Sequence, residues 1–176
     1  MAFPVAISNR GCCGTAKRRD RPEPLALQLP LLVQGVYQIM HEQFEHTADL
    51  GLRVRSPDLN TLFAEAAECL YSAFVEDLST VHPVEECAVE IAGNDLVYLL
   101  FDWLKELLYR FDGDGMLFGK FEVHVRENGL SARIWGEPFD PTRHPMSREV
   151  KAITYHQLNV QEQPDGAWLA EAILDI

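Results

Sequence analysis

Two segments in which apolar residues recur at helical spacing, each flanked by segments that alternate like strands, constrain the fold of this chain most. The first segment has one broad apolar face, formed by Leu59, Leu62, Phe63, Ala66, Leu70 and Phe74. The second is denser in leucine and predicts the more buried helix; its apolar residues are Leu96, Leu99, Leu100, Trp103, Leu104, Leu107 and Leu108. We expect Ser56 to cap the first helix, with Pro57 at its first position and Asp58 in its first turn. Gly93-Asn94-Asp95 is expected to open the second.

Strand-like alternation of apolar and polar residues covers further segments, at residues 51–55, 84–92, 116–126, 130–135, 150–160 and 167–176. Asn128-Gly129 predicts a two-residue type I′ turn, and Pro164-Asp165-Gly166 predicts the turn before the last strand. One more strand is expected ahead of residue 51, with bounds that the pattern does not define. The predicted order is therefore β-β-α-β-α-β-β-β-β. It indicates a single α+β domain with two helices packed on an antiparallel or mixed β-sheet.

The charge of the chain excludes some classes of function. The 176 residues include 15 Lys and Arg against 27 Asp and Glu, a net charge of −12, while 47% hydrophobic residues suffice for a core. A protein that binds nucleic acid by itself needs clustered basic side chains, so direct RNA binding is not expected. An acidic surface instead suits a cytoplasmic protein that binds cations or a basic partner. No apolar run reaches membrane-spanning length, so no membrane role is expected.

The N-terminal segment differs from the rest in composition. It is rich in proline, and its basic residues are Arg10, Lys17, Arg18, Arg19 and Arg21. We interpret residues 1–39 as a poorly ordered extension and residues 40–176 as the domain, with Met40 as a candidate natural start. The chain has no C-x-x-C pair, so neither a disulfide framework nor structural zinc is expected. Cys69, on the apolar side of the first helix, is interpreted as a core residue in a reducing cytoplasm.

Sequence motifs of nucleotide binding and hydrolysis are not found. The run "GDGMLFGK" at residues 113–120 lacks the spacing and the hydroxyl residue of a phosphate-binding loop. The run "DGDG" at residues 112–115 lacks the later ligands of a calcium loop. Neither G-x-S-x-G nor H-E-x-x-H occurs. We therefore do not expect this chain alone to bind a nucleotide.

Carboxylates stand at two places where the chain could bring them together. Asp49 precedes a strand within "EHTADLG", Asp175 is penultimate, and Ile176 carries the terminal carboxylate. If the last strand ran beside the Asp49 strand, three carboxylates would converge and could hold a hard divalent cation. On spacing alone, caps and surface turns explain these residues more simply, and the metal site is the alternative.

Three short motifs in this order resemble the archease family: "HTADLG" at residues 46–51, "VKAITYHQL" at 150–158 and "ILDI" at 173–176. The resemblance extends from Phe44 to Ile176. It implies a non-catalytic protein that activates a GTP-dependent RNA-splicing ligase. Archeases promote guanylylation and multiple turnover of that ligase in tRNA splicing or RNA repair, so RNA would be contacted only indirectly.

The resemblance also implies functional residues. The family's metal ligands match Asp49, Asp175 and Ile176, which would bind Ca²⁺, Mg²⁺ or Mn²⁺. Other polar positions of the matching motifs are His46, Thr47, Lys151, Thr154 and His156.

Two other kinds of function remain open from the sequence. One is a stand-alone metal-dependent phosphoesterase that uses Asp49, His46 and His156. The other is a chaperone-like interaction module that needs no metal.

Overall fold

The computed structural model describes residues 39–46 and 49–176. Within these residues the elements follow the order that the sequence predicts, with one added 3-10 turn. They are β1 (Met40–His46), β2 (Asp49–Ser56), α1 (Leu59–Phe74), the 3-10 turn η1 (Leu78–Thr80), β3 (Glu85–Ala92), α2 (Leu96–Asp114), β4 (Met116–Arg126), β5 (Gly129–Pro138), β6 (Ala152–Glu162) and β7 (Trp168–Asp175). The α+β class is therefore confirmed.

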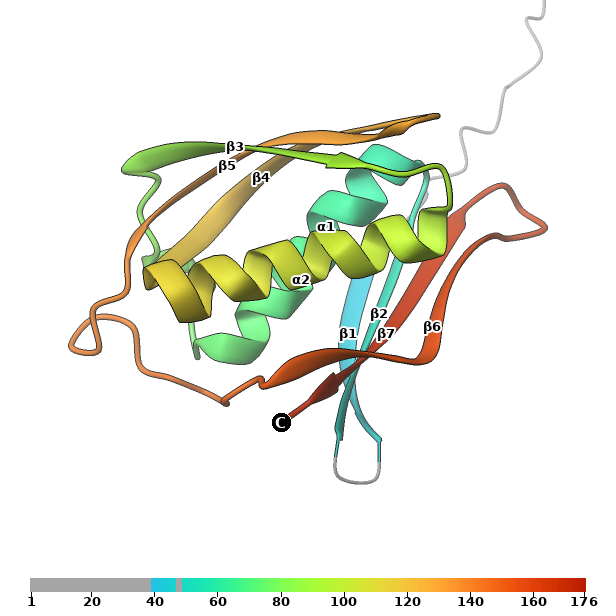
Figure 1. The fold of residues 1–176 in the computed structure, drawn as a ribbon. Helices are drawn as coiled ribbons and strands as arrows, with labels where there is room; N and C mark the ends of the chain where they lie inside the picture. Colours follow the sequence, from blue (N-terminus) through green and yellow to red (C-terminus); the bar gives the residue numbers. More distant parts are fainter. Residues whose placement is uncertain (1–38, 47–48) are drawn as a thin grey trace, which may run out of the picture. The chain divides into compact units, whose positions relative to one another are not determined.

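The strands form two sheets, and both helices lie between them (Figure 1). One sheet has the strand order β1-β2-β7-β6 and the other has the order β3-β5-β4. Each pair of neighbouring strands is antiparallel. The division into two sheets gives each helix apolar partners on two sides, which a single sheet could not do.

The two helices are held together by hydrogen bonds from aromatic side chains inside the core. Trp103 Nε1 donates to the carbonyl oxygen of Phe63 at 2.9 Å, and the Tyr71 hydroxyl donates to the carbonyl oxygen of Leu107 at 3.0 Å. Trp103 and Tyr71 are both fully buried. Each ring therefore buries a large apolar surface while its polar atom is paired.

The expectation that the second helix is the more buried is wrong. More residues of α1 than of α2 are buried, although α2 is longer. α1 packs on β2 of one sheet and β4 of the other, whereas α2 packs mainly on β6, the last strand of its sheet. One side of α2 is therefore open to solvent, where Tyr98 and Tyr109 are 60% and 64% exposed.

The cap of α1 also differs from the expectation. Ser56 is still the last residue of β2, and Asp58 caps the helix by accepting a hydrogen bond from the Thr61 backbone N–H at 3.0 Å. Pro57 consequently lies outside the helix. At α2, Asp95 caps as expected, accepting from the backbone N–H groups of Val97 and Tyr98.

The turn between β4 and β5 is not of type I′. Arg126 and Gly129 are register partners, so the two central residues are Glu127 and Asn128. Among the described non-glycine residues only Gln157 has a positive φ, whereas a type I′ turn needs positive φ at both central positions. The predicted turn at residues 164–166 is present, with Gly166 at φ 83°.

Cys69 behaves as the sequence predicts. Its side chain is buried, and burial raises the pKa of the thiol to about 12. Cys69 and Cys87 are both free thiols. No helix in the described part of the chain is long and apolar enough to cross a bilayer. The interpretation of residues 1–39 as an extension falls almost entirely outside the described residues.

Tyr71→Phe should lower the free energy of unfolding by about 1 kcal/mol, because the variant loses one buried hydrogen bond and keeps the ring. Urea denaturation of the two proteins measures this difference. Tyr109→Phe is the matched control, since the Tyr109 side chain is exposed. The inferred contribution of the hydroxyl is wrong if both variants are equally stable.

Candidate functional site

Asp49 and Asp175 are direct partners in the pairing of β2 with β7. The next pair on the core side joins Leu50 to Leu174, and both are buried. Because side chains alternate between the faces of a strand, Asp49 and Asp175 share the outer face of the sheet. The Cβ atoms of directly opposed residues lie about 4.5–5.5 Å apart, so the two side chains start from neighbouring positions on this face.

The terminal carboxylate and Lys151 complete this end of the sheet. The Lys151 backbone N–H donates to the Asp175 carbonyl oxygen at 2.8 Å, which extends the β6–β7 ladder to the end of the chain. Lys151 Nζ donates to an oxygen of the Ile176 terminus at 3.0 Å. The ends of β2, β7 and the segment before β6 therefore meet at one place, as the sequence hypothesis required.

Among the described residues, no basic side chain neutralises Asp49 or Asp175. In the parts of the chain that the structure describes, neither Asp49 nor Asp175 has an ion pair within 4.0 Å. Arg53, further along the same face, is bound by Glu42 at 2.8 Å and by Glu171 at 2.7 Å. Two opposed carboxylates without a cationic partner repel each other.

The donor set fits a hard divalent cation. Its atoms are the carboxylate oxygens of Asp49 and Asp175 and those of the Ile176 terminus, and Ca²⁺, Mg²⁺ and Mn²⁺ prefer oxygen ligands. Lys151 engages one terminal oxygen, so its ammonium group would lie beside any bound cation. The chemistry of the site therefore combines carboxylate oxygens with one nearby positive charge.

Gly51 leaves room in the same hairpin for an aromatic ring. A Cβ atom built at Gly51 would lie 2.2 Å from the ring of Phe44, its register partner on β1. The ring therefore covers the glycine on the outer face, next to Asp49 along β2. The glycine of the "HTADLG" motif makes room for this ring.

The other candidate functional residues from the sequence lie on β6 and at the turn between β1 and β2. Thr154 is opposite Ile173, on the same face as Asp175, and its Oγ1 accepts a hydrogen bond from the His156 backbone N–H at 3.3 Å. His156 is in the irregular part of β6, next to Gln157 with φ 52°. The backbone of His46 pairs with Asp49, but its side chain and Thr47 are outside what the structure describes.

A groove beside this end of the sheet was not indicated by the sequence. It has a volume of about 260 Å³ between α2 and β6, and its lining includes Lys151, Lys105, Phe101 and Tyr109. Tyr155 of β6 stacks on Phe101 with ring centroids 3.9 Å apart. Helical periodicity places residues 101, 105 and 109 on one side of α2, but only the tertiary structure brings that side to Lys151.

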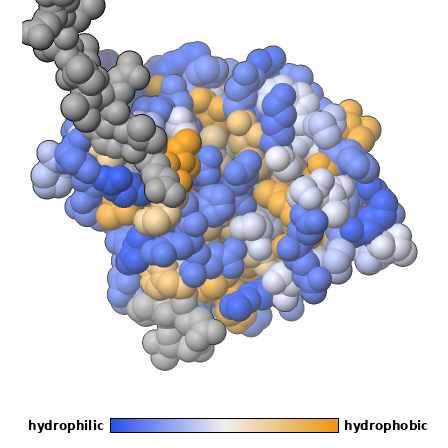
Figure 2. Space-filling model, turned by 180° about the vertical axis from the view of Figure 1, so that it is seen from behind, coloured by the Kyte–Doolittle hydropathy of each residue, from blue (hydrophilic) through white to orange (hydrophobic). Residues whose placement is uncertain are grey.

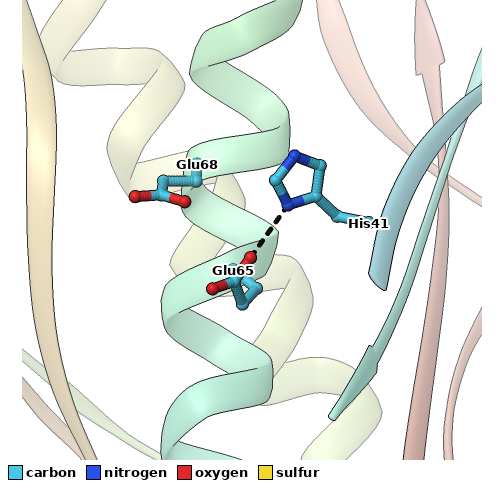
Figure 3. A group of neighbouring side chains, drawn as sticks. All are labelled: His41, Glu65 and Glu68. Carbon is cyan, nitrogen blue, oxygen red and sulfur yellow. Dashed lines mark hydrogen bonds and ion pairs between the residues drawn. The ribbon is translucent and has the colours of Figure 1, made fainter. Parts of the chain in front are cut away.

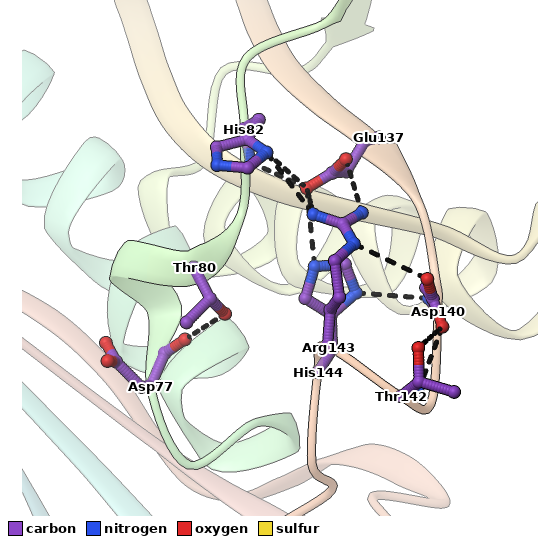
Figure 4. Close-up of polar contacts among 8 residues, drawn as sticks. All are labelled: Asp77, Thr80, His82, Glu137, Asp140, Thr142, Arg143 and His144. Atoms are coloured by element: carbon purple, nitrogen blue, oxygen red, sulfur yellow. Dashed lines mark hydrogen bonds and ion pairs between the residues drawn. The ribbon is translucent and has the colours of Figure 1, made fainter.

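A second polar cluster surrounds the buried carboxylate of Glu137 (Figure 4). Arg143 donates to both of its oxygens, at 2.7 and 3.2 Å, and the His82 backbone N–H donates at 2.8 Å. The buried His144 has Nδ1 accepting from the Asp140 backbone N–H and Nε2 3.3 Å from Glu137. This carboxylate is fully engaged, so we interpret the cluster as a tie between the loop after β5 and the segment before β3.

The Glu137 cluster should make the free energy of unfolding depend on pH in the acidic range. Hydrogen bonds from Arg143, and then from the His82 backbone, lower the pKa of Glu137 from 4.5 to about 2. Because the folded-state pKa is depressed, the stabilisation is present above about pH 4.5 and is lost as the pH falls toward 2. The free energy of unfolding should therefore fall more steeply between these pH values in the wild type than in Glu137→Gln, measured by urea denaturation. Parallel profiles for the two proteins would contradict this assignment.

Comparison with known proteins identifies relatives of the described domain. The Archease protein family (MTH1598/TM1083) matches residues 41–176. A protein archease from Methanopyrus kandleri is 47% identical over 139 residues, which cover 77% of this chain and 98% of that protein. A protein archease from Pyrococcus furiosus is 38% identical over 139 residues, covering 77% of this chain and 97% of that protein.

A solved structure shares the fold. The solution structure of Methanobacterium thermoautotrophicum protein 1598 superimposes with a TM-score of 0.70 at 37% sequence identity. The match covers 77% of this chain and 98% of that chain. The sequence resemblance, the family match and the fold therefore agree on the same part of the chain.

Proposed function

The chain belongs to the archease family, and we propose on this premise that it activates a GTP-dependent RNA-splicing ligase without being an enzyme itself. Its role would be to promote guanylylation and multiple turnover of the ligase in tRNA splicing or RNA repair. The observation that carries this proposal is the register pair of Asp49 and Asp175 beside the terminal carboxylate. The pair unites the first and last motifs of the family resemblance in one site.

Charge supports action through a protein partner. The net charge of −12 disfavours direct binding of RNA phosphates, so RNA would be bound by the ligase. On the face shown in Figure 2, hydrophobic residues gather in separate patches between hydrophilic ones. Such a surface suits a protein that docks on a partner and leaves it again. The free thiols of Cys69 and Cys87 fit the cytoplasm as its location.

Asp49, Asp175 and the Ile176 terminus would hold a divalent cation, with Ca²⁺, Mg²⁺ and Mn²⁺ as candidates. Bound there, the cation would supply positive charge toward phosphate oxygens or carboxylates of the partner. Lys151 would keep the terminal carboxylate in place through its contact with Ile176. The sheet supplies rigidity, because both aspartates belong to regular strands that pair with each other.

We further propose that this acidic end docks near the metal site of the ligase. Guanylylation requires a triphosphate and Mn²⁺ at a ligase histidine, and charge builds on the departing pyrophosphate. Carboxylates and Lys151 at the docked end would help to arrange metal or GTP in the ligase. Sealing by a ligase that already carries the guanylate would not need this help.

Asp49→Asn should weaken binding of Ca²⁺ or Mn²⁺ by at least about tenfold, because the amide removes one anionic ligand while keeping the shape of the side chain. Isothermal titration calorimetry measures the affinity. Asp102→Asn, an exposed aspartate on α2, is the matched control and should bind as the wild type does. Equal affinities for wild type and Asp49→Asn would exclude Asp49 as a ligand.

Asp49→Ala and Asp175→Ala should abolish stimulation of ligase guanylylation without unfolding this protein, because their side chains lie on the outer face of the sheet. They should leave sealing by guanylylated ligase unchanged. Single-turnover assays that start from free and from guanylylated ligase separate the two steps. Slower sealing with intact guanylylation would show that the proposed role is wrong, even with a real cation site.

Two further measurements separate the alternatives. A stand-alone phosphoesterase would hydrolyse a generic phosphoester with Mn²⁺ in the absence of ligase. A metal-independent interaction module would stimulate the ligase equally well in the Asp49 variant.

A further inference from the structure

A second group of possible ligands lies between β1 and α1, away from the Asp49 pair. His41 is on β1, and Glu65 and Glu68 lie one turn apart on α1 (Figure 3). His41 Nδ1 is 2.8 Å from Glu65 Oε2. One ligand atom from each of the three side chains lies within 4.8 Å of the other two. A single ion could therefore contact all three after small side-chain rotations.

The charges of this group are not balanced. Among the described side chains, His41 is the one basic group that pairs with Glu65 within 4.0 Å, and none pairs with Glu68. Glu68 is partly buried and lies close to Glu65. Two glutamates one helical turn apart disfavour each other by repulsion. A divalent cation between them would remove that repulsion.

The thiol of Cys69, one residue beyond Glu68, is not a ligand of this group. Its Sγ donates a hydrogen bond to the Glu42 carbonyl oxygen at 3.8 Å, and it is not among the ligand atoms that lie within 4.8 Å of one another. The donor set is therefore one imidazole nitrogen and two carboxylates. Imidazole favours Zn²⁺ and related transition metals, whereas the all-oxygen set at Asp49 favours harder cations.

We propose that His41, Glu65 and Glu68 form a second cation site, which binds Zn²⁺ or a similar divalent transition metal. Water would complete the coordination, because the His41 side chain is 40% exposed. The ion would join the edge strand β1 to α1. This inference does not rest on the proposed action on a ligase.

The position of the site gives it a structural effect. β1 pairs with β2 along its whole length, from Met40 opposite Arg55 to His46 opposite Asp49. Gln43 already ties β1 to α1, through a hydrogen bond to Ser72 Oγ at 3.0 Å. An ion at His41 would strengthen the same attachment and stabilise the hairpin of β1 and β2.

The test is calorimetric titration of the full chain with Zn²⁺ in saturating Ca²⁺, so that the oxygen site is occupied. Cys12 and Cys13 are replaced by serine to remove two competing thiols. His41→Ala and Glu68→Gln should each weaken Zn²⁺ binding by at least about tenfold. His124→Ala, an exposed histidine on β4, is the matched control and should bind as the parent does.

Thermal unfolding supplies a second readout. Zn²⁺ should raise the melting temperature of the parent and of Asp49→Asn, but not of His41→Ala or Glu68→Gln. Glu68→Gln without metal should be at least as stable as the parent, because it loses the repulsion from Glu65. Unchanged Zn²⁺ affinity in both His41→Ala and Glu68→Gln would overturn the proposal. Loss of Zn²⁺ binding in Asp49→Asn instead would assign the ion to the other site.

Discussion

The pairing of β2 with β7 is the constraint on which both the fold and the site depend. On its core side it buries Leu50 with Leu174 and Val54 with Ala170. On its outer side the same register sets Asp49 opposite Asp175. A slip of one residue would expose the leucines and bury the aspartates, so the apolar core holds the carboxylates in place. The energy that orders the site therefore comes from burial on the opposite face.

The hairpin of β1 and β2 links this pairing to the helices. Its outer face carries the Phe44 ring over Gly51 and the ion pairs of Arg53 with Glu42 and Glu171. On the other face of β1, His41 and Gln43 reach polar groups of α1. An edge strand held by polar contacts opens more easily than one held by an apolar core. A cation bound at His41 would add to the contacts that hold this edge strand.

Periodicity and capping signals predicted the helices, the strands and their order well. Asp95 caps α2, and the order of strands and helices follows the predicted one. Two errors arose where strand pairing overrode a local signal. Ser56 and Asp58 are both good caps, and the strand pairing of Ser56 with Trp168 left the cap to Asp58. Asn128-Gly129 is a strong turn signal, but the register of β4 and β5 shifts the turn by one residue.

The sequence by itself determined the α+β class and the identity of the family, because periodicity and short motifs are local properties of the chain. It also singled out Asp49, Asp175 and the Ile176 carboxylate as candidate cation ligands. It did not determine which helix is enclosed, since periodicity reports the width of an apolar face but not the number of elements around it. The sequence also did not indicate that His41 lies close to Glu65 and Glu68, or that Lys151 binds the carboxylate of Ile176. Those contacts join residues far apart in the chain, and only strand pairing and the packing of the sheets on the helices decide such distances.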